Sequence, residues 1–213
     1  MTFVTGTAIP DEAPDHHEAS LAGLIETWRH IHAVRVEGPL ADFVRIDSAT
    51  HYVERITNIW AKQLADNRTD PLTPKLEALV DRWAESGARQ ILAEPQPPTF
   101  SRGDANLLNW LHDPASGKTG CVDFEFSGTS DPAFDVADLV EHISGRTFAD
   151  DVWGDVVDAL GGGDGTFTWR FRAAQRTCAL RWLAVLWKQR HARSEEFNVQ
   201  LERARRLHQL PIC

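Results

Sequence analysis

The stretch "SRGDANLLNWLHD", residues 101–113, places polar side chains inside an otherwise apolar run. Asp104 stands between two small residues, and Asn109 follows five positions later. A second stretch, "CVDFEFSG" at 121–128, again sets an aspartate, Asp123, after an apolar segment. A core strand has no need of such side chains, so their presence indicates a function other than packing.

Between these stretches, "DPASGK" at 113–118 has the composition of a tight turn. The sequence therefore predicts a β-hairpin with strands at 109–112 and 119–124, preceded by a short β-like piece at 99–100. In a hairpin the start of one strand lies beside the end of its partner. Three oxygen-bearing side chains are expected to meet there: Asp104, Asn109 and Asp123.

These three side chains match the needs of phosphoryl transfer. Mg²⁺ prefers one or two carboxylates, a carbonyl oxygen and substrate phosphates, so Asn109 and Asp123 could supply the protein part of a metal site. Asp104 would then accept a proton from an attacking hydroxyl. The alternative is that aspartate and asparagine cap turns. That alternative is the simpler one for each residue alone, but the spacing of all three favours a site.

Composition and charge narrow the class of protein. The chain has 213 residues and a formal net charge of -9, which disfavours nucleic acid as a partner and permits metals or cationic small molecules. Three distant cysteines without a CxxC pair argue against a disulfide scaffold or zinc site and favour a reducing cytoplasm. No apolar run is long enough for a membrane span, so no membrane partner is expected either.

Apolar residues at three- and four-residue steps predict helices on both sides of the hairpin. Their expected starts or spans are near Asp15, after the caps Asp47 and Ser48, at Thr73, at Asp131, and twice within 168–207. Most of the eight tryptophans fall at this helical spacing and are expected in the core. The glycine-rich segment 161–165 lacks the Lys-Ser/Thr of a phosphate loop and is expected to be a linker.

An acidic cluster follows the hairpin region. It consists of Asp150, Asp151, Asp155 and Asp158, with Trp153 among them. An aromatic face near carboxylates could bind an ammonium group of a substrate through a cation–π contact. The other interpretation, which is favoured, is an ordinary solvated helix with one buried tryptophan.

"RGDANLLN" followed by "CVDFEFSGTSDPAFDVADLVEH" resembles the aminoglycoside phosphotransferase and choline kinase family, a branch of the protein-kinase-like fold. That family shows H-G-D-x-x-x-x-N, a strand ending in Asp, and then G-x-x-x-D-P-x-x-D-L-A. The resemblance implies an α+β, mostly helical fold, namely a protein-kinase-like C-terminal lobe with a small central β-hairpin. It divides the chain into a hinge-like segment, 1–14, and a helical lobe, 15–213, which carries the catalytic hairpin, 99–124.

The resemblance also implies roles for single residues. Asp104 corresponds to the catalytic base, and Asn109 and Asp123 correspond to the ligands of Mg²⁺ that bind the nucleotide. Arg102 stands where the family has histidine, and it is expected either to shape the catalytic loop through backbone carbonyls or to touch a phosphate. Asp131 and Asp135 are expected to be structural. His32 resembles the family's Leu-His after the hinge, or is a helix-terminal histidine bonded to a carbonyl.

The N-terminal β lobe of kinase-like proteins is expected to be absent from this sequence. Such a lobe supplies a glycine-rich loop and a strand lysine for the phosphates. No G-x-G-x-x-G precedes Asp104, and the four lysines all follow the first predicted helix. Three explanations stay open: a misplaced start codon or split gene, a lobe supplied by a separate chain, or a standalone lobe that has lost ATP turnover.

The resemblance implies a kinase that uses ATP and Mg²⁺ to phosphorylate a hydroxyl of a small molecule, either aminoglycoside-like or an amino-alcohol. Activity of this chain alone is expected to be weak, because the lysine and the loop are missing. One alternative is a non-catalytic, pseudokinase-like binding module. A less favoured one is a metal-dependent hydrolase that uses Asp104, Asp123 and a histidine.

Overall fold

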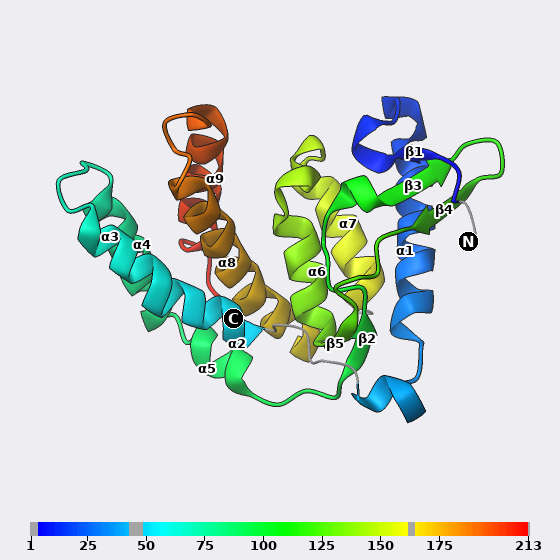
Figure 1. Ribbon diagram of the computed structural model, residues 1–213, viewed down its shortest axis with the longest axis horizontal. Coiled ribbons are helices and arrows are strands. Elements are labelled where there is room, and N and C mark those ends of the chain that lie inside the picture. The colour runs from blue at the N-terminus through cyan, green and yellow to red at the C-terminus, as the bar shows by residue number, and fades with distance from the viewer. Residues whose placement is uncertain (1–3, 43–48, 162–164, 213) are drawn as a thin grey trace. The chain divides into compact units, whose positions relative to one another are not determined.

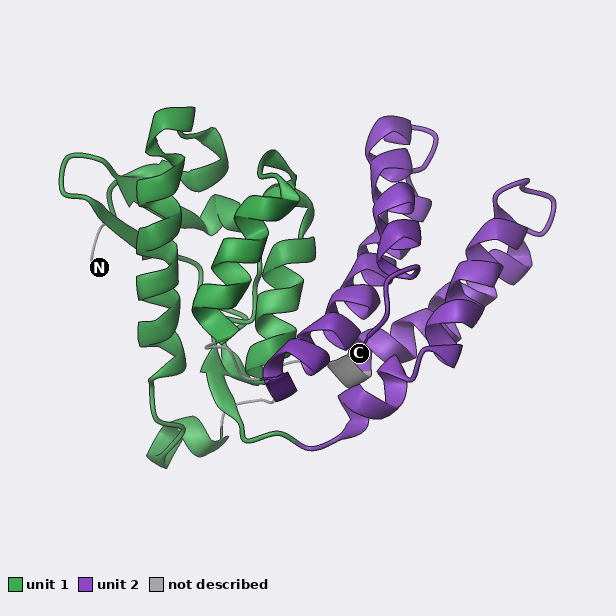
Figure 2. Ribbon diagram, turned by 180° about the vertical axis from the view of Figure 1, so that it is seen from behind, with its two compact units in different colours: residues 1–46, 96–164 green, residues 47–95, 165–213 purple. Residues whose placement is uncertain are grey.

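The computed structural model describes residues 4–42, 49–161 and 165–212 of the chain. The fold is mostly helical, with two small antiparallel sheets among the described residues (Figure 1). This confirms the predicted α+β, mostly helical class. The chain divides into two compact units, residues 1–46 with 96–164 (unit 1) and residues 47–95 with 165–213 (unit 2), as Figure 2 shows. The predicted boundary between segments 1–14 and 15–213 stays a prediction.

The central sheet of unit 1 contains the predicted hairpin. Strands β3 (Trp110–Asp113) and β4 (Lys118–Cys121) are antiparallel, with Trp110 opposite Cys121. In the turn, the Asp113 carboxylate accepts hydrogen bonds from the Ala115 backbone N–H at 3.1 Å and the Ser116 hydroxyl at 2.7 Å. The hairpin is therefore confirmed, and its turn residues act as their chemistry predicts.

The second hairpin strand is shorter than predicted. It ends at Cys121 rather than at residue 124. Val122 still donates its N–H to the Asn109 carbonyl at 3.0 Å, but Asp123 has a backbone φ of 66°, which turns the chain out of the sheet. Strand β1 (Thr7–Ala8), which lies in the expected hinge-like segment, pairs with β3 and completes the order β1-β3-β4.

A second sheet joins β2 (Thr99–Ser101) to β5 (Gly128–Ser130). Strand β2 contains the β-like piece predicted at 99–100, whereas β5 was not predicted. The chain runs from β2 directly into Arg102, and the segment after Asp123 leads into β5. The pair therefore fixes both ends of the segment that carries the candidate site.

Helices α1 (His17–His32), α6 (Pro132–Glu141) and α7 (Asp150–Gly161) complete unit 1 (Figure 1). The predicted apolar stripe of α1 is buried at Leu21, Leu24 and Trp28. Helix α1 lies close to β4, because a Cβ atom on Gly23 would come within 2.4 Å of the Thr119 hydroxyl. A larger residue at position 23 would push the helix away from the hairpin.

The regular secondary structure in the described part of unit 2 is all helical. Its elements are α2 (Ala49–Glu54), a π-helical stretch (Arg55–Trp60), α3 (Ala61–Asp66), α4 (Thr73–Glu85), α5 (Ala88–Ala93), α8 (Gly165–Trp187) and α9 (Ser194–Leu207). The helix predicted over 52–64 is thus continuous but changes its hydrogen-bond pattern midway. Helix α5 was not predicted. The predicted caps Asp47 and Ser48, and linker residues 162–164, lie outside the described residues.

The tryptophans are mostly core residues, as the helical spacing predicts. Six of the eight are buried: Trp28, Trp60, Trp83, Trp110, Trp153 and Trp187. In unit 2, the Trp83 indole N–H donates to the Thr177 hydroxyl at 3.0 Å, which satisfies its polar atom inside the core. No helix in the described part of the chain has the length and apolar character needed to cross a membrane.

Candidate active site

The loop between β2 and β3 is shaped by its own polar side chains. Gly103 takes a left-handed φ of 75°, which a side chain would strain. The Asp104 carboxylate then accepts the Asn106 backbone N–H at 3.0 Å, and the Asn106 side chain accepts the Leu108 N–H at 3.1 Å. Two successive turns of this kind lead into a short 3-10 helix, Leu107–Asn109, just before β3.

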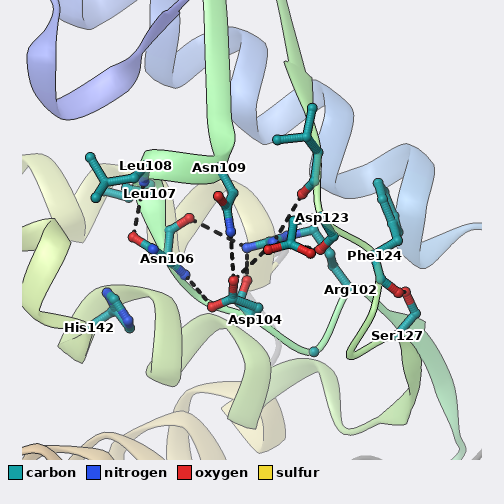
Figure 3. Close-up of polar contacts among 12 residues, drawn as sticks. Arg102, Asp104, Asn106, Leu107, Leu108, Asn109, Asp123, Phe124, Ser127 and His142 are labelled. Atoms are coloured by element: carbon teal, nitrogen blue, oxygen red, sulfur yellow. Dashed lines mark hydrogen bonds and ion pairs between the residues drawn. The ribbon is translucent and has the colours of Figure 1, made fainter. Parts of the chain in front are cut away.

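Asp104 and Asn109 contact each other directly. The Asn109 side-chain amide donates to Asp104 Oδ2 at 2.7 Å (Figure 3). Because an ionised carboxylate only accepts hydrogen bonds, this contact fixes the amide nitrogen toward Asp104 and turns the amide oxygen away from it. Asp104 is 21% exposed, so its carboxylate still reaches solvent.

Asp123 lies beside this pair (Figure 3). It is the one non-glycine residue with a positive φ among the residues that the structure describes. A left-handed φ costs on the order of 1 kcal/mol for a residue with a side chain, and such strain clusters at functional sites. The Asp123 side chain is exposed. The turn thus directs a carboxylate to solvent next to Asp104 and Asn109.

Arg102 lies behind these side chains and is only 3% exposed. Its Nη1 donates to the carbonyl oxygens of Val122 and Asp123, at 3.2 and 3.1 Å, and lies 3.3 Å from Asp104 Oδ2. Its Nη2 donates to the Asp104 carbonyl. These contacts agree with the expected loop-shaping role through backbone carbonyls, whereas a phosphate contact would require an exposed guanidinium. A catalytic role for Arg102 stays a prediction.

His142 supports the loop from the end of α6, and the sequence analysis missed it. Its Nδ1 accepts the Ser144 backbone N–H at 3.1 Å, and the Ser144 hydroxyl accepts the Leu107 N–H at 2.9 Å. Burial lowers the pKa of His142 to about 4, although the nearby Asp104 carboxylate acts in the opposite direction. His142 is therefore neutral at pH 7. Only its position in the fold, which the sequence does not reveal, brings it to the loop.

The aspartates after the hairpin have structural contacts. Asp131 caps α6 by accepting the backbone N–H groups of Ala133 and Phe134. Asp135 accepts the Ser130 hydroxyl at 2.5 Å and lies 3.3 Å from His32 Nε2. His32 Nε2 thus contacts a carboxylate, whereas the second interpretation of His32 expected a bond to a backbone carbonyl. Both aspartates stabilise the segment that follows the site.

The acidic cluster on α7 does not form a cation–π site. Trp153 is 2% exposed, and its indole N–H donates to the Gly145 carbonyl at 3.1 Å. Its four acidic neighbours are all exposed: Asp150, Asp151, Asp155 and Asp158. The favoured interpretation, a solvated helix with one buried tryptophan, agrees with the structure. A cation bound to this ring would require the helix to turn over.

The donor set at the hairpin fits Mg²⁺. It consists of the Asp123 carboxylate and the Asn109 amide oxygen, with the Asp104 carboxylate beside them. Mg²⁺ uses one or two protein carboxylates and completes its shell with water and substrate phosphates. Among the described residues, no group of three or more His, Cys, Asp or Glu could hold a metal ion. The hydrolase alternative, which needs Asp104, Asp123 and a histidine, stays the less favoured one.

Solved structures with the same fold include a choline/ethanolamine kinase family protein from Mesorhizobium loti, with 20% identity and a TM-score of 0.65, over 98% of this chain and 68% of that one. An aminoglycoside 2'-phosphotransferase in complex with GDP has 19% identity and a TM-score of 0.60, over 96% and 67% of the two chains. A spectinomycin phosphotransferase with ADP and spectinomycin has 13% identity and a TM-score of 0.54, over 98% and 70%. The chain thus spans about two thirds of each of these proteins.

The TM-scores, which range from 0.54 to 0.65, show that the chain shares the protein-kinase-like fold of these structures. A comparison with curated proteins finds no match. A family comparison does: residues 1–175 match the phosphotransferase enzyme family, and the match includes the whole hairpin with Asp104, Asn109 and Asp123. Because this match covers most of the chain, and because the resemblance predicted from the hairpin is confirmed by it, the chain belongs to the phosphotransferase enzyme family.

Proposed function

We propose that this chain carries the catalytic half of a kinase that transfers the γ-phosphate of ATP to a hydroxyl of a small molecule. The observation that supports this most strongly is the 2.7 Å contact between the Asn109 amide and the Asp104 carboxylate, with the exposed Asp123 carboxylate beside them. A base, an amide oxygen and a second carboxylate in one place are the parts that phosphoryl transfer requires from this half of a kinase.

In this proposal Asp104 orients the acceptor hydroxyl and accepts its proton as the oxygen attacks phosphorus. Asn109 and Asp123 would hold Mg²⁺, whose charge would offset that of the phosphates. The contact between Asn109 and Asp104 couples the two tasks, because the same amide that offers its oxygen to the cation fixes Asp104 Oδ2 through its nitrogen. Arg102 fixes the two loops from behind and does not need to reach the substrate.

The acceptor class is an aminoglycoside or an amino-alcohol. This assignment rests on the relatives, which include a spectinomycin phosphotransferase and a choline/ethanolamine kinase family protein. The solved relatives are complexes with ADP in one case and GDP in another, so both ATP and GTP belong in the assay. The contacts of α7 do not help to identify the acceptor, because Trp153 is buried.

The second candidate is a non-catalytic binding module. The two lysines that precede Asp104 in the sequence, Lys62 and Lys75, lie on helices α3 and α4 of unit 2. Neither is the strand lysine that contacts the nucleotide phosphates in kinases. A module of this kind would bind nucleotide through Asn109 and Asp123 without turning it over.

The test is phosphate transfer from labelled ATP or GTP, with Mg²⁺, to a panel of aminoglycosides and amino-alcohols. Asp104→Asn keeps the shape but removes the base, so turnover should fall by about 1,000-fold. Asp158→Asn is the matched control, since Asp158 is exposed on α7 and should leave turnover unchanged. Equal turnover in the two variants would refute the proposed function. Nucleotide binding without turnover in the wild type would favour the binding module.

A further inference from the structure

A row of buried side chains runs away from the candidate site inside unit 1. The Arg102 guanidinium carbon lies 5.8 Å from the centre of the Trp110 ring. Trp110 stacks on Trp28, with ring centres 5.5 Å apart and an interplanar angle of 18°. Trp28 in turn lies 5.3 Å from the His32 ring. These four side chains are Arg102, Trp110, Trp28 and His32, and they come from three separate segments of the sequence.

His32, at the far end of this row, is connected to the strand that precedes Arg102. His32 Nε2 lies 3.3 Å from Asp135 Oδ2, and the other oxygen of Asp135 accepts the Ser130 hydroxyl at 2.5 Å. Ser130 belongs to β5 and pairs with Thr99 in β2. Strand β2 ends at the residue before Arg102. The row is therefore fixed at both ends, so its packing determines where the guanidinium lies.

Packing contributes more than hydrogen bonding in this row, because some of its buried polar atoms have no hydrogen-bond partner. Among the described residues, the indole N–H groups of Trp28 and Trp110 and the Nε–H of Arg102 are buried without a hydrogen-bond partner. A buried donor without a partner is unfavourable, so these groups are not there for hydrogen bonding. What the two indoles supply is their ring faces: Trp110 offers one to the Arg102 guanidinium, and Trp28 stacks on Trp110.

We propose that Trp110 is a positioning residue for the candidate active site and that it acts through Arg102. The Trp110 ring holds the guanidinium in the position where it donates to the carbonyls of Val122 and Asp123 and pairs with Asp104. It thereby fixes the base and the exposed Asp123 carboxylate relative to each other. The kinetic consequence of this inference rests on the proposed function, but its structural consequence does not.

Trp110→Leu removes the ring face that packs against the guanidinium but does not change the Arg102 residue itself. If the proposed function holds, kcat should fall by about 100-fold, since a small displacement of reacting groups has an effect of that size. The KM for nucleotide should rise by much less than kcat falls, because Trp110 is buried and touches no substrate, and Asp123 is displaced only slightly. Trp110→Phe keeps a face for the cation and should restore kcat to within about fivefold of the wild type.

The matched control is Trp60→Leu in unit 2. Trp60 is 1% exposed and its indole N–H also lacks a partner among the described residues, so the same truncation is made in a comparable core. It should lower the melting temperature as Trp110→Leu does and leave kcat per folded molecule unchanged. Trp110→Met, whose longer and more flexible side chain adapts to the cavity, replaces the leucine variant where that variant does not fold.

A second readout is independent of turnover. In the wild type, NMR should resolve separate signals for the Arg102 guanidinium protons, because fixed acceptors prevent rotation of the group. The signals should merge in Trp110→Leu and stay separate in Trp110→Phe and Trp60→Leu. Separate signals in a folded Trp110→Leu would overturn the inference, as would equal kcat values for this variant and Trp60→Leu. If the wild type shows no turnover, the proposed function fails while the guanidinium signals still decide this inference.

Discussion

The loop 102–109 and the helix α7 both carry aspartate and lie in unit 1 with a tryptophan close by, yet they differ in what their side chains contact. In the loop, Asp104 is bonded by Asn109, by a backbone N–H and by a buried arginine, while part of it stays exposed. On α7 the aspartates face solvent and Trp153 packs inward. Mutual contacts among polar groups, rather than the number of charges, distinguish the candidate site.

The difference has a simple origin in local geometry. On α7, Asp151, Asp155 and Asp158 are separated by four and three residues, so they share one face of the helix, and that face is exposed to solvent. In the loop, turns formed by Asp104 and Asn106 reverse the chain within a few residues and bring Asn109 back to Asp104. Several variants and a change of pH break or sharpen this contrast. The largest effect on activity is expected for Asp104→Asn, the variant that tests the proposed function.

The largest effect on stability is expected on α7. Trp153→Ala should lower the free energy of unfolding by about 4 kcal/mol, because it empties a core site and removes the hydrogen bond to Gly145. Asp158→Asn should change it by less than about 0.5 kcal/mol. Denaturant unfolding measures both. A loss of acceptor affinity in Trp153→Ala, at unchanged stability, would contradict the structural role given to α7.

Acid should destabilise the protein through His142. Its pKa is lowered to about 4 in the folded state, so below the ordinary pKa near 6.5 the unfolded chain takes up a proton that the folded chain does not. Stability should therefore fall as the pH drops from about 6.5 to 4, by up to about 3 kcal/mol, and this group should have no effect at higher pH. Unfolding curves across this range provide the measurement.

His142→Asn keeps an acceptor for the Ser144 N–H and removes the titrating ring. Its unfolding free energy should depend less on pH in the same range. His208 in unit 2 also has its pKa lowered to about 4 by burial, so His208→Asn should flatten the pH dependence by a similar amount without affecting the loop. A pH dependence unchanged in His142→Asn would mean that folding does not lower the pKa of this histidine.

The smallest effect on stability is expected at Asp123, where a variant separates stability from function. Asp123→Gly removes a side chain from a left-handed backbone, so the free energy of unfolding should stay the same or rise by about 1 kcal/mol. The same change removes the proposed ligand of Mg²⁺ and should abolish magnesium-dependent nucleotide binding in calorimetry. A variant that is destabilised yet binds normally would show that Asp123 serves the fold.

The sequence predicts the parts of this structure that depend on local pattern. The stripe of α1, the proline and cap of α6 and the turn at Asp113 each follow from residues within a few positions of one another. The convergence of Asp104 and Asn109 follows as well, because a five-residue separation in a tight loop limits where the second side chain can lie.

Long-range pairing explains what the sequence does not predict. Strands β1 and β5 contain two and three residues, and they exist only because β3 and β2 lie opposite them. The π-helical stretch at Arg55–Trp60 interrupts a regular apolar stripe without any proline or glycine to mark it. The support from His142 and the stacking of Trp110 on Trp28 likewise join segments far apart in the chain.

The most direct test of the central claim is to locate the metal by paramagnetic NMR. Mn²⁺ replaces Mg²⁺ at oxygen sites, and with ATP present it should first broaden the backbone signals of Asn109 and Asp123. Asp123→Gly should remove this broadening. The account predicts that the amides of α7 stay sharp at the same metal concentration. Broadening confined to the aspartates of α7, with Asn109 and Asp123 unaffected, would contradict it.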